Sequence, residues 1–205
     1  MDPDRRDLLN QLVTASLAAG AGASAPALAA QPAAALAEGE VQPGPAMTRG
    51  PVVQRTPGRP GDFDFLTGRW HIRNHRRRDG GWDHFDGEAS CVGLLDGVCS
   101  VEELRIPARE FSGIGLRLLD RQRQVWSDHW VNARSGVVGV PGLEGSFEDG
   151  AGIFASEEMV EGRRVLYRSV WDLITPQSCR WQQGSSRDEG RSWQVDWSMD
   201  WRRIG

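Results

Sequence analysis

Residues 192–201 read Ser-Trp-Gln-Val-Asp-Trp-Ser-Met-Asp-Trp, and every second residue from Trp193 to Trp201 is apolar. The residues between them are Gln, Asp and Ser, so apolar and polar side chains fall on opposite faces of an extended strand. Three tryptophans on one face form a large aromatic surface. Such a surface is typical of a packed core, of a pocket wall, or of a stacking platform for nucleic acid.

The same alternation continues through the chain from Trp70 onward. Turn residues interrupt the runs at regular intervals, and no long segment follows the 3.6-residue period of a helix. This pattern predicts an all-β fold of about nine or ten strands, arranged as an antiparallel barrel or sandwich. The expected turns are Asp79–Gly81, Asp96–Gly97, Asp120, Ser135–Gly136, Glu148–Gly150, Glu161–Gly162, Thr175–Pro176 and Asp188–Gly190.

The pair Asp96–Gly97 is typical of a two-residue type I′ turn between antiparallel strands. Such a turn pairs Leu95 with Val98 and sets Glu88 opposite Arg105. With this register the apolar and polar side chains separate onto the two faces of the hairpin, as a half-buried sheet requires.

The chain contains three cysteines, Cys91, Cys99 and Cys179, without a C-x-x-C spacing that would favour a zinc site. Their odd number leaves at least one thiol unpaired within the chain. The hairpin register places Cys91 and Cys99 on opposite faces, which disfavours a disulfide between them. A three-residue loop centred on Leu95 would instead make them direct partners.

Two acidic residues fall on apolar faces. Glu102 has the parity of the inward residues of its strand, and Asp128 shares a face with Trp126 and Trp130. A buried carboxylate is costly unless it is paired or hydrogen-bonded. Either these acids meet an inward arginine, backbone amides or a wet barrel mouth, or they line a cavity where they orient a ligand or act as acid and base.

Residues 1–29 are typical of an export signal, because paired arginines precede a weakly apolar stretch that ends in a small-residue cleavage site at Ala29. The arginines favour a twin-arginine signal and predict a periplasmic or secreted protein; the alternative is a disordered, Ala-rich N-terminus on a cytosolic protein. Residues 30–61 are rich in Ala, Pro and Gly without an apolar period, which predicts a disordered linker. Residues 62–205 remain as one domain.

The chain has a formal net charge of −4 at pH 7, and all of its 24 basic residues are arginine. A mildly acidic protein lacks the basic charge that gives affinity for phosphate backbones, so nucleic acid is not an expected partner. The lack of lysine excludes Schiff-base catalysis and lysine-dependent phosphate loops. No segment after the signal is apolar and long enough to span a membrane.

Residues 62–70 read Asp-Phe-Asp-Phe-Leu-Thr-Gly-Arg-Trp, and Gly68-x-Trp70 resembles the G-x-W opening of lipocalins and other calycins. The resemblance implies that an arginine near the last strand stacks across Trp70 and closes one end of the barrel. Arg203 has the parity of the inward tryptophans and is the expected partner, whereas Arg202 has the outward parity. A guanidinium over an indole ring is a favourable cation–π pair.

The chain is also similar to an uncharacterised bacterial family of lipocalin-like domains that opens with an FDFLxGxW motif, here Phe63–Trp70. A GxFxDGxGxF run at Gly145–Phe154 and an RWxQxxSxDxGxxW run at Arg180–Trp193 match later parts of the family pattern. The resemblance covers the whole domain and implies a single antiparallel up-and-down β-barrel of the lipocalin or calycin type. It implies no particular activity.

A barrel of this size can hold one small ligand. We expect an exported barrel that binds a small apolar or aromatic molecule, rather than an enzyme. The expected ligand-binding residues are Trp126, Asp128, Trp130, Trp181, Gln183, Trp193 and Trp197. One alternative is an isomerase, cyclase or hydratase with Glu102 or Asp128 as general base. Another is that the tryptophans fill the barrel and the function lies on its surface.

The chain contains no G-x-S-x-G elbow, H-E-x-x-H helix or dinucleotide-binding fingerprint, and no cofactor or metal site is predicted. His71 and His75 share a strand face and could together bind a metal ion, but a solvated outer face is the favoured interpretation. A haem-binding barrel is a minor alternative, which the outward parity of His84 and His129 disfavours.

Overall fold

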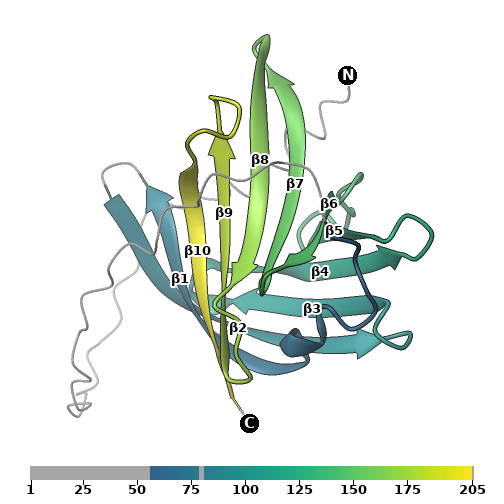
Figure 1. Cartoon of the computed structure of the whole chain (residues 1–205). Helices are drawn as coiled ribbons and strands as arrows, with labels where there is room; N and C mark the ends of the chain where they lie inside the picture. The colour runs from purple at the N-terminus through teal and green to yellow at the C-terminus, as the bar shows by residue number, and fades with distance from the viewer. Residues whose placement is uncertain (1–55, 79–80, 205) are drawn as a thin grey trace, which may run out of the picture. The chain divides into compact units, whose positions relative to one another are not determined.

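The computed structural model describes residues 56–78 and 81–204. Ten strands pair with their neighbours in chain order, and β1 pairs with β10 to close the sheet, which confirms the antiparallel up-and-down barrel (Figure 1). The predicted export signal, its cleavage site near Ala29 and most of the predicted linker lie outside the described residues. Within the described residues, no helix is long and apolar enough to cross a membrane.

The strands follow the alternation of the sequence. In the last strand Trp197, Met199 and Trp201 are buried, while Asp200 and Arg202 between and after them are exposed. The elements are η1 (Asp64–Leu66), β1 (Gly68–Arg78), β2 (Gly81–Leu94), β3 (Cys99–Ile106), η2 (Pro107–Arg109), β4 (Phe111–Asp120), β5 (Val125–Asn132), β6 (Leu143–Glu148), β7 (Ala151–Val160), β8 (Arg163–Asp172), β9 (Ser178–Ser186) and β10 (Gln194–Arg203), where η marks a 3-10 helix.

The β2–β3 hairpin has the register that its turn predicts. Glu88 pairs with Arg105, and the Arg105 Nε lies 3.0 Å from a carboxylate oxygen of Glu88. Asp96 and Gly97 have φ angles of 55° and 79°, which is the left-handed backbone of a type I′ turn. The short-range turn chemistry therefore fixes which residues of both strands face inward.

The three cysteines are buried free thiols. Cys91 pairs with Glu102 on the inner face of the barrel, while Cys99 pairs with Leu94 on the outer face, so the predicted placement on opposite faces is confirmed. Burial is the largest cause that raises the pKa of Cys179, to about 12. This thiol is therefore protonated, and unreactive as a nucleophile, at neutral pH.

The short helix η1 covers one end of the barrel, which we call the closed end. Phe63 and Leu66 are buried there, and Phe63 meets the rings of Trp126 and Phe147 edge-on at centroid distances of 4.9 and 5.0 Å. Trp70 Nε1 donates a 2.6 Å hydrogen bond to the Leu66 carbonyl. The FDFL segment is thus a plug of aromatic and aliphatic side chains.

Arg203 fastens this plug to the last strand. Its guanidinium carbon lies 4.3 Å from the ring centroid of Trp70, which is the contact that the calycin resemblance implies. The same guanidinium donates hydrogen bonds to the carbonyls of Phe65 at 2.7 Å, Pro176 at 2.8 Å and Thr67. One side chain therefore joins η1, the loop before β9 and the first strand.

The last residues of the predicted linker are held against the barrel. Gly58 N donates to the Gln124 carbonyl at 2.7 Å, and Gly61 N donates to the Gly97 carbonyl at 2.9 Å. A Cβ atom at Gly58 would lie 2.8 Å from Trp126, so glycine permits this close approach. The packed domain therefore begins before the boundary at residue 62 that the sequence predicts.

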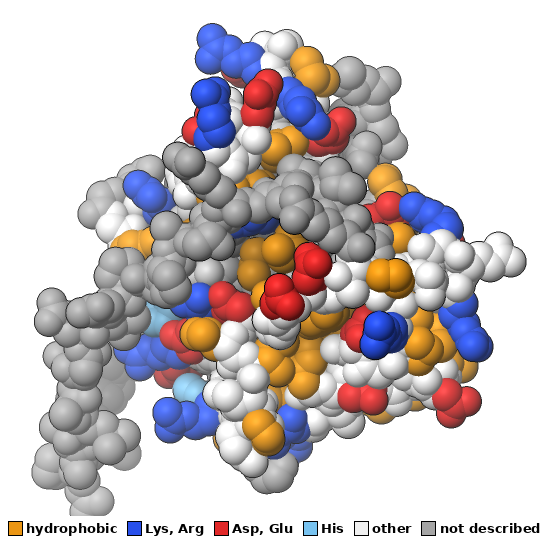
Figure 2. Space-filling view, in the orientation of Figure 1, with side chains coloured by type: hydrophobic (Ala, Val, Ile, Leu, Met, Phe, Trp, Pro, Cys, Tyr) orange, Lys and Arg blue, Asp and Glu red, His pale blue; other side chains and the backbone are white. Residues whose placement is uncertain are grey.

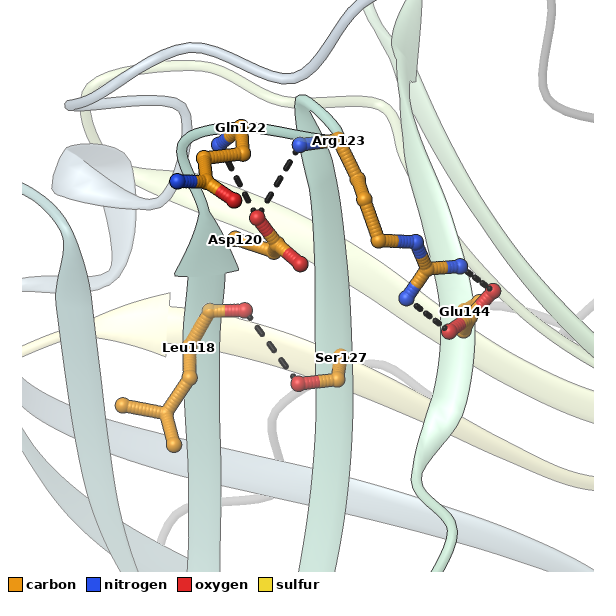
Figure 3. Close-up of polar contacts among 6 residues, drawn as sticks. All are labelled: Leu118, Asp120, Gln122, Arg123, Ser127 and Glu144. Carbon is orange, nitrogen blue, oxygen red and sulfur yellow. Dashed lines mark hydrogen bonds and ion pairs between the residues drawn. The ribbon is translucent and has the colours of Figure 1, made fainter.

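The turn between β4 and β5 is tied to β6 (Figure 3). Asp120 Oδ1 accepts hydrogen bonds from the backbone N–H groups of Gln122 and Arg123, at 2.9 and 3.0 Å. Arg123 then donates two 2.8 Å hydrogen bonds to the two carboxylate oxygens of Glu144. Only three residue pairs join β5 to β6 in this part of the sheet, so the side-chain pair supports a short strand contact.

We expect Arg203→Gln to destabilise the protein by about 1–3 kcal/mol, because it removes a cation–π contact and charged donors to three backbone carbonyls. Urea unfolding followed by circular dichroism measures the change. Arg202→Gln removes the same charge from the next residue, whose side chain is exposed, and should cost less than about 0.5 kcal/mol. Equal losses in the two variants would contradict the role given to Arg203.

Candidate functional site

In the half of the barrel away from the closed end, four inward aromatic side chains lie in contact with one another. We call Phe111, Trp130, Trp181 and Trp197 the aromatic cluster. The Phe111 and Trp130 rings stack with an interplanar angle of 6°, and Trp197 meets Phe111 and Trp181 at centroid distances of 6.1 and 6.0 Å. Strands β4, β5, β9 and β10 therefore bring together rings that are far apart in the sequence.

Three rings of this cluster are partly exposed, unlike two tryptophans of the closed end. Phe111, Trp130 and Trp181 keep part of their surface exposed, whereas Trp70 and Trp126 at the closed end are 0% exposed. Phe111 was not among the residues expected from the sequence; its position at the first residue of a strand, before alternating glycines, was the signal that could have found it.

The position of the Trp130 ring requires a glycine on the neighbouring strand. Gly113 lies inward on β4, beside Trp130 on β5, and a Cβ atom at Gly113 would collide with the indole ring. The ring therefore lies against bare backbone instead of pointing across the barrel.

Trp197 is held by two groups from β1. Its Nε1 donates a 3.0 Å hydrogen bond to Asn74 Oδ1, and the guanidinium carbon of Arg76 lies 4.9 Å from its ring centroid. Asn74 is fully buried, so the hydrogen bond fixes the orientation of the indole. Trp197 thus presents a fixed ring between Phe111 and Trp181.

A buried ion-pair network lies between the closed end and the aromatic cluster. Arg117 Nη2 donates to Glu102 Oε2 at 2.5 Å, and Arg117 Nε lies 3.5 Å from Asp128 Oδ1. The side chains of Glu102 and Arg117 are 4% and 5% exposed. The sequence left open whether the inward acids are paired within the fold or line a cavity. The structure shows the pairing, because the inward Arg117 compensates both carboxylates.

The Arg117 guanidinium also reaches across the interior. Its central carbon lies 5.2 Å from the ring centroids of both Phe63 and Trp171. Burial lowers the pKa of Arg117, but the two carboxylates raise it by more, so the guanidinium remains charged. Arg117 therefore forms the boundary between the packed closed end and the other half of the barrel.

Asp128 differs from Glu102 in its electrostatics. Burial is the largest influence on its carboxyl, and together with the charge of Glu102 it outweighs Arg117 and raises the pKa to about 6. Its side chain is 14% exposed and lies on the same strand face as Trp130. Asp128 is therefore a carboxyl group beside the aromatic cluster that can gain or lose a proton near neutral pH.

Trp126 and Gln183 lie apart from one another in the barrel. Trp126 belongs to the closed end, where its Nε1 donates a 3.1 Å hydrogen bond to Asp62 and its ring packs on Phe63. Gln183 pairs with Trp197 on the inner face, beside the aromatic cluster. Of the residues expected from the sequence, the structure thus gathers Asp128, Gln183 and three tryptophans, but not Trp126.

Trp193 was expected on the inner face, and the structure places it outside. A β-bulge between Val195 and Trp197 shifts the pairing with β9 by one residue, which reverses the parity of the strand before it. Trp193 instead packs on the outer face, where the guanidinium carbon of Arg168 lies 4.0 Å from its ring centroid. The strict alternation of the sequence hides this inserted residue.

Several polar side-chain atoms in the interior are buried and make no hydrogen bond in the described part of the chain. All of them can donate one. They are Asn74 Nδ2, Arg117 Nε and Nη1, Trp130 Nε1, Ser169 Oγ, Trp171 Nε1 and Trp201 Nε1. A buried donor without a hydrogen bond costs about 1–3 kcal/mol. Of these atoms, Trp130 Nε1 belongs to the aromatic cluster.

The histidines lie on the outer face, as their parity predicts, but His75 is not solvated. It is 6% exposed, its Nδ1 lies 2.7 Å from His84 Nδ1, and its Nε2 lies 3.0 Å from Asp200. His129 Nδ1 donates to the Gly139 carbonyl at 2.8 Å. Residues 56–78 and 81–204 contain no group of three or more side chains placed to hold a metal ion.

Three solved structures are similar to this chain. A DUF3598-family protein of unknown function from Nostoc punctiforme PCC 73102 matches with a TM-score of 0.40 and 12% identity, over 74% of this chain and 51% of that protein, so this chain spans about half of its length. The S-type phycobiliprotein lyase CPES from Guillardia theta matches at 0.45 and 10%, over 70% and 90% of the two chains. Rv2717c from M. tuberculosis matches at 0.44 and 11%, over 70% and 95%. No family model and no curated protein matches the sequence.

We expect Asp128→Asn to stabilise the protein at pH 8 but not at pH 4. The folded-state pKa of about 6 exceeds the ordinary value of 3.8, so the folded protein holds the proton more tightly than the unfolded chain does. The ionised carboxylate therefore costs about 1–3 kcal/mol above pH 6, and this cost disappears towards pH 4.

Urea unfolding of both proteins at the two pH values measures this difference. Asp149→Asn, in an exposed turn, serves as the control and should change little at either pH. A gain in stability that is larger at pH 4 than at pH 8 would show that Asp128 is not held mainly by desolvation.

Proposed function

We propose that the barrel binds a small, largely aromatic molecule at the aromatic cluster. The observation that carries this proposal is a contrast within one interior: Trp70, Trp126 and Phe154 at the closed end are 0% exposed, whereas Phe111, Trp130 and Trp181 keep part of their surface exposed. Inward aromatic side chains with free surface are the usual walls of small-molecule sites in barrels.

The polar groups of the interior support the same proposal. Trp130 Nε1 and two nitrogens of Arg117 are buried donors without a hydrogen bond among the described residues. A ligand with carbonyl, ether or ring-nitrogen acceptors would pair with them and relieve their desolvation. The ligand class is therefore an aromatic molecule with acceptor groups.

A second candidate function uses Asp128 as a general base. A pKa of about 6 suits proton transfer near neutral pH, and this carboxyl adjoins the aromatic cluster, whereas Glu102 is bound by Arg117. The two functions differ in what Asp128→Asn does. A binding barrel would keep its ligand unchanged, while an isomerase, cyclase or hydratase would bind the ligand but cease to convert it.

The surface supports a small-molecule partner rather than nucleic acid. On the face shown in Figure 2, arginine and acidic side chains lie side by side instead of forming one continuous basic area. Nucleic-acid binding draws its affinity mainly from such basic areas. This agrees with the net charge of −4 over the whole chain.

Binding can be tested with N-phenyl-1-naphthylamine, a neutral aromatic molecule whose fluorescence increases in apolar sites. We expect the protein to enhance this fluorescence and the tryptophan emission to be quenched by energy transfer. Trp130→Ala removes a stacking wall and should weaken binding about 10-fold, since aromatic contacts and their buried area contribute about 1–3 kcal/mol.

Trp193→Ala is the matched control, because this tryptophan lies on the outer face. It should change the affinity less than twofold. If the wild-type protein does not enhance the probe, or if the two substitutions weaken binding equally, the proposed function is wrong.

We further propose that the chain is exported, on the basis of the paired arginines and the small-residue site in residues 1–29. Expression in a bacterium with twin-arginine export should yield a periplasmic protein whose N-terminal sequence begins near residue 30. Substitution of both Arg5 and Arg6 by Gln should leave the precursor in the cytoplasm. Full-length protein in the cytoplasm without either substitution would contradict export.

A further inference from the structure

Arg76 is the last inward residue of a row on β1 that begins at Trp70 and includes Asn74. Its Cα partners are Asp83 on β2 and Trp197 on β10. The side chain is partly buried, and its guanidinium carbon lies over the Trp197 ring at 4.9 Å. Arg76 therefore adjoins the aromatic cluster on the side away from the closed end.

The Arg76 guanidinium makes no hydrogen bond and no ion pair with any described residue. The nearby carboxylates are engaged elsewhere: Asp83 accepts two 2.7 Å hydrogen bonds from Arg109, and Asp196 accepts one of 3.3 Å from Gln194. Cation–π contact with Trp197 is its one specific interaction in the described chain. Its N–H donors are thus open to a partner outside the protein.

Electrostatics set this arginine apart from Arg117. Burial, and then the charge of Arg78, lower the pKa of Arg76, and the charges of Asp83 and Asp196 offset this only in part. Arg117 is compensated by two carboxylates in contact with it. Arg117 is therefore compensated by direct ion pairs, while Arg76 has no carboxylate in ion-pair contact with it among the described residues.

The positions of these charged groups predict how a charged ligand would be oriented in the barrel. A carboxylate or sulfonate would find charged donors at Arg76, in the planar arrangement that guanidinium offers to oxyanions. The same group beside Glu102 and Asp128 would meet two acids. An aromatic body would instead contact the partly exposed rings of Phe111, Trp130 and Trp181 deeper in the barrel.

We infer that the ligand is an amphipathic aromatic anion whose carboxylate or sulfonate is bound by Arg76 while its ring lies in the aromatic cluster. This inference rests on the proposed function, and it adds the chemical class of the ligand and a specificity-determining residue. In this arrangement Trp197 contacts both parts of the site. One face of its ring lies against the Arg76 guanidinium, and its ring also meets Phe111 and Trp181.

Two fluorescent probes distinguish the contribution of the ligand's negative charge from that of its aromatic rings. N-phenyl-1-naphthylamine is neutral, and 1-anilinonaphthalene-8-sulfonate has the same aromatic system with a sulfonate. Displacement of the first by the second tests whether they share one site. Dissociation constants of both are then measured for the wild-type protein and for Arg76→Gln, Arg76→Lys and Arg73→Gln.

We expect Arg76→Gln to weaken binding of the sulfonate about 10-fold or more, as loss of a charge-assisted hydrogen bond does, and to change binding of the neutral probe less than twofold. Arg76→Lys should recover part of the sulfonate affinity. Arg73→Gln removes the same charge from the outer face of the same strand, where the side chain is exposed, and should change neither constant more than twofold.

The outcomes distinguish the two proposals. If the wild-type protein binds neither probe, the proposed function fails and this inference fails with it. If the neutral probe binds but Arg76→Gln weakens both probes equally or neither, the binding function stands and the role of Arg76 is wrong. Equal effects of Arg73→Gln and Arg76→Gln on the sulfonate would likewise reduce the effect to overall charge and overturn the inference.

Discussion

The buried charge of Arg117 is the constraint on which the interior of this barrel depends. A guanidinium in that position is compensated mainly by Glu102, in direct contact, with Asp128 at 3.5 Å, and Phe63 and Trp171 offer it aromatic surfaces. These contacts join β3, β4, β5 and β8 across the interior above the closed end. Aromatic rings connect the two halves as well, because Trp171 meets Trp201 and Trp181 at centroid distances of 5.3 and 6.5 Å.

The fold was predictable from the sequence because its determinants are local. Alternation in each strand, the Asp96–Gly97 turn and the G-x-W opening each act over a few residues, and each agrees with the closed sheet. Gly68 shows why that opening needs glycine: a Cβ atom there would collide with the guanidinium of Arg203. The inward acids were also predictable, and the alternation from Phe111 to Leu119 contained their partner, Arg117.

The candidate site was predictable only in part, because pairing between distant strands decides it. The bulge near Asp196 turns Trp193 outward, and that register depends on contacts with β9 which no pattern within β10 reveals. The same holds for His75 on the outer face. Its position in the alternation predicted the outer face correctly, but its burial comes from contacts with His84 on β2 and Asp200 on β10. The period of the sequence predicts which face of the sheet a side chain lies on, whereas its burial and hydrogen bonds depend on residues of neighbouring strands.

Two inward arginines, Arg117 and Arg76, differ in the groups around them, and this difference predicts different roles. Arg117 and Arg76 have the same chemistry and the same inward parity, on β4 and β1. Arg117 is neutralised by carboxylates in contact and holds the interior together; Arg76 has an indole ring beneath it and no ion-pair partner among the described residues. A compensated buried charge is explained by the fold alone. A partly buried guanidinium without an ion pair, beside partly exposed aromatic rings, is instead the feature from which we infer a ligand of opposite charge.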